Sequence, residues 1–133
     1  MAKCTNIKLD VQTGTDRTIY ATWTWNKTHR DHYEIRWYYD TGDGVWFVGT
    51  DSTTTSKQNT YSAPDNAKRV GFKVKPVPKK VKKTVKAKNG SKKTVKVNAW
   101  NAEWSTLKYY NIKNNPPSTP PAPTVTTENL TPT

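Results

Sequence analysis

Residues 18–49 have the sequence TIYATWTWNKTHRDHYEIRWYYDTGDGVWFVG and contain four of the six tryptophans and four of the seven tyrosines of the chain. Three runs within this stretch, 19–25, 33–39 and 45–48, have the pattern of β-strands. Successive side chains of a strand point to opposite faces of a sheet, so an alternation of apolar and polar residues predicts one apolar face and one solvent-exposed face. Residues 41–44, Thr-Gly-Asp-Gly, have the composition of a hairpin turn. The stretch therefore predicts the centre of an antiparallel β-sheet.

The composition of the 133-residue chain favours one all-β domain. Only 32% of the residues are apolar, and Leu, Ile and Met are scarce, so Trp, Tyr and Val must fill the core. No segment shows sustained helical periodicity. Further strands are predicted at 5–12, 59–62, 68–77 and 106–112, and a polar loop at 51–57. Pro76 has no N–H to donate, so the strand at 68–77 is expected to end there or to lie at an edge.

The net charge of +12 is concentrated in one segment. Residues 68–96 contain thirteen of the 22 Lys and Arg residues and no acidic residue. Such a segment could attract phosphate, teichoic acid, acidic lipid or an acidic protein surface. With Cys4 as its single cysteine, the chain can form no internal disulfide. It has no apolar run typical of a membrane span or a secretion signal, so we expect synthesis in the cytoplasm without membrane insertion.

Within this basic segment, residues 81–97 have the pattern of a β-hairpin. Two arms rich in Val and Lys flank Asn89-Gly90, a strong signal for a tight turn. The register has two alternatives. A three-residue loop at 89–91 would pair Val85 with Val95, whereas a two-residue loop would place Lys86 opposite Lys93, which is unfavourable without an anion between them.

About seven short strands, a tryptophan in the second and a proline-rich exit are typical of a β-sandwich. In these features the chain resembles a fibronectin type III domain, in the divergent form found in tail and other virion proteins of tailed bacteriophages. The segments that carry the resemblance are ATWTW (21–25), YEIRW (33–37), VGFKVKP (70–76), AEWS (102–105) and PPSTPPAPTV (116–125).

The resemblance implies an Ig-like antiparallel sandwich over residues 1–113, with the lysine-rich hairpin as an insertion at 78–98 where the family has a short loop. It also implies a spacer, adhesion or interaction module without an active site, located in the virion. Residues 114–133 are predicted to be a Pro/Thr-rich linker or tail that leads to a further module.

Motifs for catalysis or metal binding are weak in this sequence. Asp40-Thr41-Gly42 matches the aspartic-protease triplet, but its place between two strands favours a turn. His29 and His32 would be neighbours only on a helix, and no further pair of ligands lies nearby. We therefore expect no enzyme, no cofactor and no metal site.

The tryptophans have two interpretations, as core residues or as platforms for sugar rings. Trp23 and Trp37 are predicted to be core residues. Trp46 and Trp100 could stay partly exposed and serve as secondary contact residues.

The charge and the resemblance together predict contact residues on the hairpin for another virion protein or an anionic polymer of the bacterial surface. These residues are Lys79, Lys80, Lys82, Lys83, Lys86, Lys88, Lys92 and Lys93. Two alternatives are a nucleic-acid-binding module that uses the same lysines and a carbohydrate-binding module that uses an exposed tryptophan. A fourth interpretation gives the lysines no ligand, because charges on a strand edge also prevent aggregation.

Overall fold

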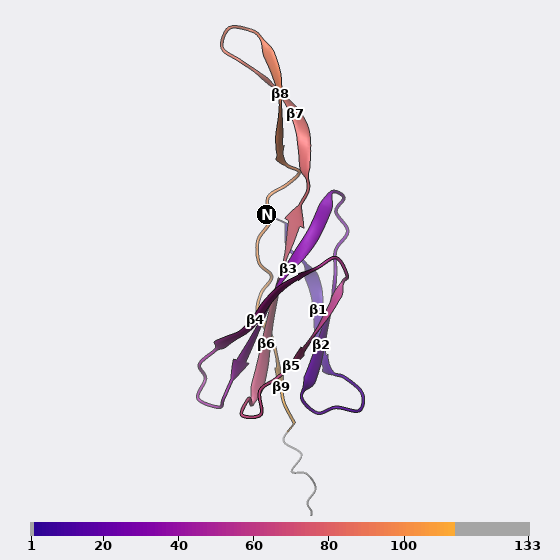
Figure 1. The fold of residues 1–133 in the computed structure, drawn as a ribbon, viewed down its shortest axis with the longest axis vertical. Helices are drawn as coiled ribbons and strands as arrows, with labels where there is room; N and C mark the ends of the chain where they lie inside the picture. Colours follow the sequence, from indigo (N-terminus) through magenta and orange to yellow (C-terminus); the bar gives the residue numbers. More distant parts are fainter. Residues whose placement is uncertain (1, 114–133) are drawn as a thin grey trace, which may run out of the picture.

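The computed structural model describes residues 2–113, and this part of the chain contains nine β-strands and no helix. The strands that form the body of the molecule are β1 (Thr5–Val11), β2 (Thr18–Thr24), β3 (Arg30–Asp40), β4 (Phe47–Thr54), β5 (Gln58–Ser62), β6 (Arg69–Pro78) and β9 (Lys108–Asn111). The other two, β7 (Lys80–Lys86) and β8 (Lys92–Asn98), form a separate hairpin (Figure 1). The linker predicted at 114–133 lies outside the described residues.

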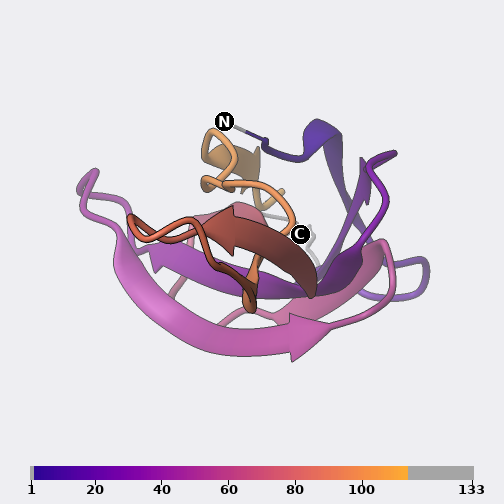
Figure 2. The same cartoon turned by 90° about the horizontal axis from the view of Figure 1, so that it is seen from above.

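The body of the molecule is a β-sandwich of two antiparallel sheets. One sheet has the strand order β1-β2-β5 and the other has the order β4-β3-β6-β9. Figure 2 looks down the long axis and shows the hairpin lying over one end of the sandwich, with β4 curving along an outer edge. This arrangement confirms the predicted all-β antiparallel sandwich with a lysine-rich hairpin insertion.

Aromatic side chains from both sheets meet in the core. Trp23 of β2 lies 5.5 Å from Phe72 of β6, and Trp37 of β3 stacks on Tyr61 of β5 with 5.5 Å between ring centroids. The Trp37 indole donates a hydrogen bond of 2.8 Å to the side-chain oxygen of Asn59, which satisfies its buried N–H. Trp23 and Trp37 are 3% and 0% exposed, so their predicted place in the core is confirmed.

Strand β6 buries alternate residues, as its pattern predicts. Its apolar positions are fully buried, namely Val70, Phe72 and Val74. Pro76 is also buried, and the strand continues past it to Pro78. Because β9 pairs with β6 only as far as Phe72, Pro76 lies where β6 is an edge, which is the second of the two predicted alternatives.

Strand β4 differs from the prediction in both position and length. It begins at Phe47 rather than Val45, and it extends to Thr54 through residues predicted to form a polar loop. Its partner is β3 alone, so it is an edge strand, and most of its side chains are exposed. An exposed edge strand needs no alternation of apolar residues, and threonine favours extended backbone. The polar composition of 51–54 was therefore compatible with a strand.

Candidate anion-binding surface

The β7–β8 hairpin projects from the end of the sandwich and is fixed at its base. The Lys79 N–H donates to the His29 carbonyl at 2.6 Å, and the Ala99 N–H donates to the Lys79 carbonyl at 3.0 Å. Just beyond β8, the Trp100 indole donates to the Thr28 carbonyl at 2.9 Å. These hydrogen bonds tie both arms of the hairpin to the β2–β3 connection, so the base of the hairpin has a defined position on the sandwich.

The turn of the hairpin decides which lysines lie together. The Gly90 N–H donates to the Ala87 carbonyl at 3.0 Å, and the Ala87 N–H donates to the Ser91 carbonyl at 2.7 Å, so the loop is Lys88-Asn89-Gly90. Both predicted registers are therefore wrong. A three-residue hairpin loop ends in a left-handed residue, and Gly90, with φ of 86°, occupies that position. The loop had the predicted length but begins one residue earlier.

In this register, five lysines share one face of the hairpin, here called the lysine face. They are Lys80, Lys82, Lys86, Lys92 and Lys96. Lys82 pairs directly with Lys96, and Lys86 pairs directly with Lys92. Side chains in directly opposed positions have Cβ atoms only about 5 Å apart, so each pair is repulsive unless an anion screens it. Within residues 2–113, the ion pairs involve His32, Arg36 and Arg69 and none of these lysines.

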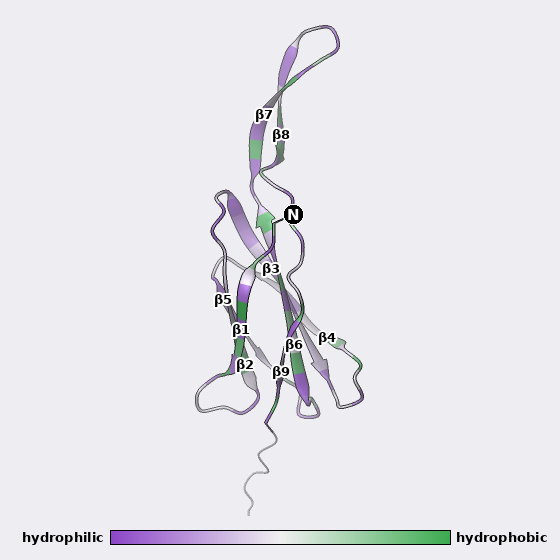
Figure 3. Cartoon of the chain, turned by 180° about the vertical axis from the view of Figure 1, so that it is seen from behind, coloured by the Kyte–Doolittle hydropathy of each residue, from purple (hydrophilic) through white to green (hydrophobic). Residues whose placement is uncertain are grey.

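The opposite side of the hairpin, the valine face, is more apolar. It carries four half-buried valines, Val81, Val85, Val95 and Val97, together with Lys83 and Lys93. In Figure 3, the hydrophilic colour of the hairpin is interrupted by short hydrophobic segments. The valines pack against each other across the ribbon and offset part of the repulsion on the other face. The hairpin therefore separates its apolar and charged side chains between two faces.

The structure places the predicted contact lysines in four different settings. Lys80, Lys82, Lys86 and Lys92 belong to the lysine face, and Lys83 and Lys93 to the valine face. Lys79 lies at the base and Lys88 in the turn. Lys96 completes the lysine face but was missed by the sequence analysis. The requirement for glycine at the last loop position would have fixed the register and identified it.

The two secondary candidates, Trp46 and Trp100, are both half-buried. The guanidinium of Arg69 lies 4.4 Å from the centroid of the Trp46 ring, and Tyr109 and Tyr38 lie against the same side chain. Trp46 is thus packed among neighbours rather than presented as a platform. Trp100 contacts Trp25 at 4.9 Å between centroids, close to the base of the hairpin.

The structure also locates the Asp40 triplet, the single cysteine and the side chains that could bind a metal ion. The triplet that begins at Asp40 forms the turn that was predicted, with the Asp40 carboxylate accepting the Gly42 N–H at 2.8 Å. Burial raises the pKa of the Cys4 thiol to about 12, which leaves it protonated at neutral pH. In residues 2–113, no three side chains among His, Cys, Asp and Glu come together as ligands for a metal ion.

The same described part of the chain contains no helix that could span a membrane. Comparisons with models of protein families, with curated proteins and with solved structures find no match to this chain.

Proposed function

We propose that this chain is a non-catalytic interaction module of a tailed-phage virion protein, built on a fibronectin type III-like sandwich. The arrangement of three strands against four, with the hairpin between β6 and β9, supports a fibronectin type III-like domain with an enlarged loop. The observation that carries the functional proposal is the lysine face. Five lysines lie on one side of a projecting ribbon, and four of them are directly opposed in pairs.

The partner that this face suits best is an anionic polymer of the bacterial envelope. A row of lysines makes contacts with phosphate or carboxylate groups that depend on charge rather than on sequence. An anion placed between Lys82 and Lys96 would turn a repulsive pair into a bridged one. An acidic surface of another virion subunit would meet the same requirement, and the module would then act as a spacer.

The test is binding to bacterial cells, and to polymers extracted from their envelopes, across a salt series. The test variant changes Lys82, Lys86, Lys92 and Lys96 to Ser. The matched control changes four exposed lysines of the sandwich, Lys8, Lys68, Lys108 and Lys113, to Ser. Both variants lose the same net charge. We expect the first variant to lose about tenfold or more in affinity, and the control to lose much less.

In the unchanged protein, binding should weaken as salt screens the charges. Equal losses in the two variants would show that net charge alone is responsible, and the lysine face would then have no special role.

A nucleic-acid-binding module is the second candidate, supported by the same row of lysines. Phosphate contacts of this kind give a steep dependence of affinity on salt. Duplex DNA is therefore included in the same series, and tighter binding of DNA than of cells or envelope polymers would favour this candidate.

A further inference from the structure

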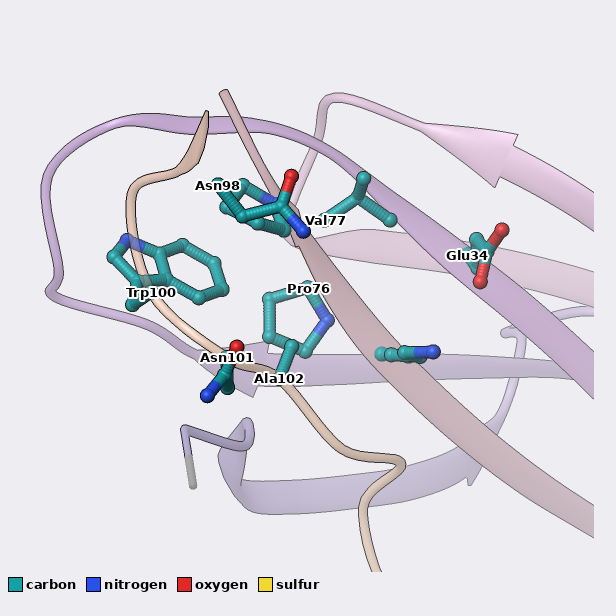
Figure 4. Close-up of a pocket in the computed structure, with 9 residues that line it drawn as sticks. Glu34, Pro76, Val77, Asn98, Trp100, Asn101 and Ala102 are labelled. Carbon is teal, nitrogen blue, oxygen red and sulfur yellow. The ribbon is translucent and has the colours of Figure 1, made fainter. Parts of the chain in front are cut away.

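An open hollow of about 360 Å³ lies at the base of the hairpin, between β6, β3 and the segment that follows β8. Its polar lining comes from Glu34, Lys75, Asn98 and Asn101, and Trp100 supplies an aromatic wall (Figure 4). The side chains of Asn98 and Asn101 are exposed. The backbone of Asn101 is held in place by its carbonyl, which accepts the Ala2 N–H at 3.0 Å. The amide groups of both asparagines are therefore available to a ligand.

The hollow is continuous with the lysine face. Asn98 pairs with Lys80 in the hairpin and is two residues from Lys96, so it lies on the same face of the ribbon as the five lysines. Two residues along a strand span about 7 Å, so Lys96 projects from the ribbon about that far from Asn98. A linear ligand that follows the lysines toward the sandwich would enter the hollow at Asn98.

The surface continues beyond the hollow onto the outer face of the larger sheet. Glu34 also lines a second hollow of about 310 Å³, together with Arg36 and Trp104. The cationic groups of Arg36, Lys73 and Lys75 lie 5.6 to 6.0 Å from the centroid of the Trp104 ring. Three cationic groups thus gather around one aromatic ring at this end of the surface.

The chemistry of the hollow differs from that of the lysine face. Glu34 and Lys75 are paired across β3 and β6, so their opposite charges offset each other in the hollow. The amides of Asn98 and Asn101 both donate and accept hydrogen bonds. Hydroxyl groups satisfy all of these partners, and phosphate or sulfate groups do not. Aromatic walls beside polar side chains are typical of small-molecule pockets. The hollow therefore fits a neutral ring that carries hydroxyl groups, and the lysines fit its charged neighbours.

We propose that the hollow and the lysine face form one extended site for an anionic glycopolymer, in which a sugar ring occupies the hollow and the charged groups contact the lysines. This inference rests on the proposed function for the lysine face and adds the class of ligand. A nucleic acid fits less well, because the hollow contains one carboxylate, Glu34, and one ammonium group, Lys75, and so offers phosphates no net positive charge.

The experiment compares three polymers and a neutral sugar. Dextran sulfate of low substitution, in which most rings carry no sulfate, supplies neutral rings together with charge, and polyphosphate supplies charge without rings. Single-stranded DNA supplies phosphates and bases, and short dextran oligosaccharides supply neutral rings alone. The test variant is Asn98→Ala with Asn101→Ala, and the matched control is Asn66→Ala with Asn111→Ala, which removes two exposed amides elsewhere. Affinity is measured for each polymer, and chemical shifts of the Trp100 indole N–H are followed with the oligosaccharides.

We expect the Asn98/Asn101 variant to bind dextran sulfate about tenfold more weakly, while its affinity for polyphosphate is unchanged. The control should bind both polymers as the unchanged protein does. Dextran oligosaccharides should shift the Trp100 resonance in the unchanged protein and not in the variant.

Equal losses for dextran sulfate and polyphosphate, or no loss for either, would overturn the glycopolymer site. A loss confined to single-stranded DNA would overturn it in favour of nucleic acid. The variant with Lys82, Lys86, Lys92 and Lys96 changed to Ser separates the two proposals. If it binds both polyanions as before, the proposed function fails, whereas a Trp100 shift with neutral oligosaccharides would still show that the hollow takes a sugar ring.

Discussion

The carboxylate of Asp40 is 2% exposed and has three partners. It accepts hydrogen bonds from the Gly42 N–H at 2.8 Å and the Gly44 N–H at 3.2 Å, and from the Arg69 guanidinium at 2.8 Å. The Gly42 hydrogen bond, together with those from Arg69 and Gly44, holds the pKa of the Asp40 carboxyl below its usual value, against the opposing effect of desolvation. The ionised carboxylate of Asp40 thus connects the β3–β4 turn to Arg69 of β6.

This arrangement predicts how stability depends on pH. Because the pKa of Asp40 is lower in the folded than in the unfolded chain, its stabilising effect is complete above the unfolded value of about 3.9 and is lost as the pH falls through the folded value. Asp40→Asn should lower the Tm at neutral pH by several degrees. The gap between the two proteins should narrow below about pH 4.

Thermal unfolding measured from about pH 7 to about pH 2.5 checks this prediction. Asp43→Asn, in the same turn but exposed, is the control and should leave the Tm nearly unchanged. A gap between Asp40→Asn and the unchanged protein that stays constant over the whole range would show that the charge of Asp40 is not what stabilises the turn.

At the scale of elements, the hairpin shows how one backbone position sets the register. Gly90 has φ of 86° and Gly14, in the β1–β2 turn, has φ of 85°. A Cβ added at either position would meet no atom within 4 Å. Replacing each glycine with alanine therefore introduces the same backbone strain, about 1 to 2 kcal/mol, without a steric clash.

We expect this strain to act on different parts of the molecule. Gly90→Ala should loosen the hairpin, weaken polyanion binding severalfold and leave the Tm of the sandwich nearly unchanged, because the hairpin contacts the sandwich only near its base. Gly14→Ala should lower the free energy of unfolding by about 1 kcal/mol and leave binding unchanged. Cross-strand proton contacts measured by NMR, with a thermal melt, separate these effects. A lowered Tm for both variants would mean that hairpin and sandwich unfold as one unit.

The elements that the sequence predicted well are those with a buried face. The alternation of apolar and polar residues located β2, β3 and β6 correctly. Each of these strands buries one side only, so every second residue in its sequence is apolar. Strand β4 was misplaced because it is exposed on both sides and has no such pattern. The Asn89-Gly90 pair predicted the hairpin correctly, but the register could not be predicted from the sequence. Both faces of the hairpin contain lysine, so no single pairing of the two arms is clearly favoured.

At the scale of the whole molecule, the sequence predicted the class of fold and four of the five lysines of the lysine face, but not which lysines share that face. The scarcity of Leu and Ile pointed correctly to an aromatic core in a β-sandwich. The hollow at the hairpin base was beyond prediction, because it combines Glu34 of β3 with Asn98 and Asn101, which are more than sixty residues away in the chain. Such a site depends on how the hairpin sits on the sandwich, and no local pattern encodes that.

The fold also separates the core from the proposed binding surface, and this separation leads to a last prediction. The rings that fill the core come from β2, β3, β5 and β6, and none comes from the hairpin. The Ala99 N–H already donates to the Lys79 carbonyl, so these two residues can flank a tight turn. Replacing residues 80–98 with Asn-Gly should therefore leave a folded sandwich that unfolds cooperatively.

This shortened chain should keep a Tm within about 5 °C of the full chain, because only base contacts are lost. Its binding to polyanions should fall to background. Trp23→Ala in the full chain keeps the hairpin but disrupts the core. It should lower the free energy of unfolding by about 3 to 5 kcal/mol, because it removes a ring that packs against Tyr33 and Phe72. Near-ultraviolet circular dichroism during a thermal melt measures the stability of the shortened chain and of the Trp23→Ala variant. A shortened chain without a cooperative transition would show that the hairpin is part of the folding unit, and the lysine face would then also have a structural role.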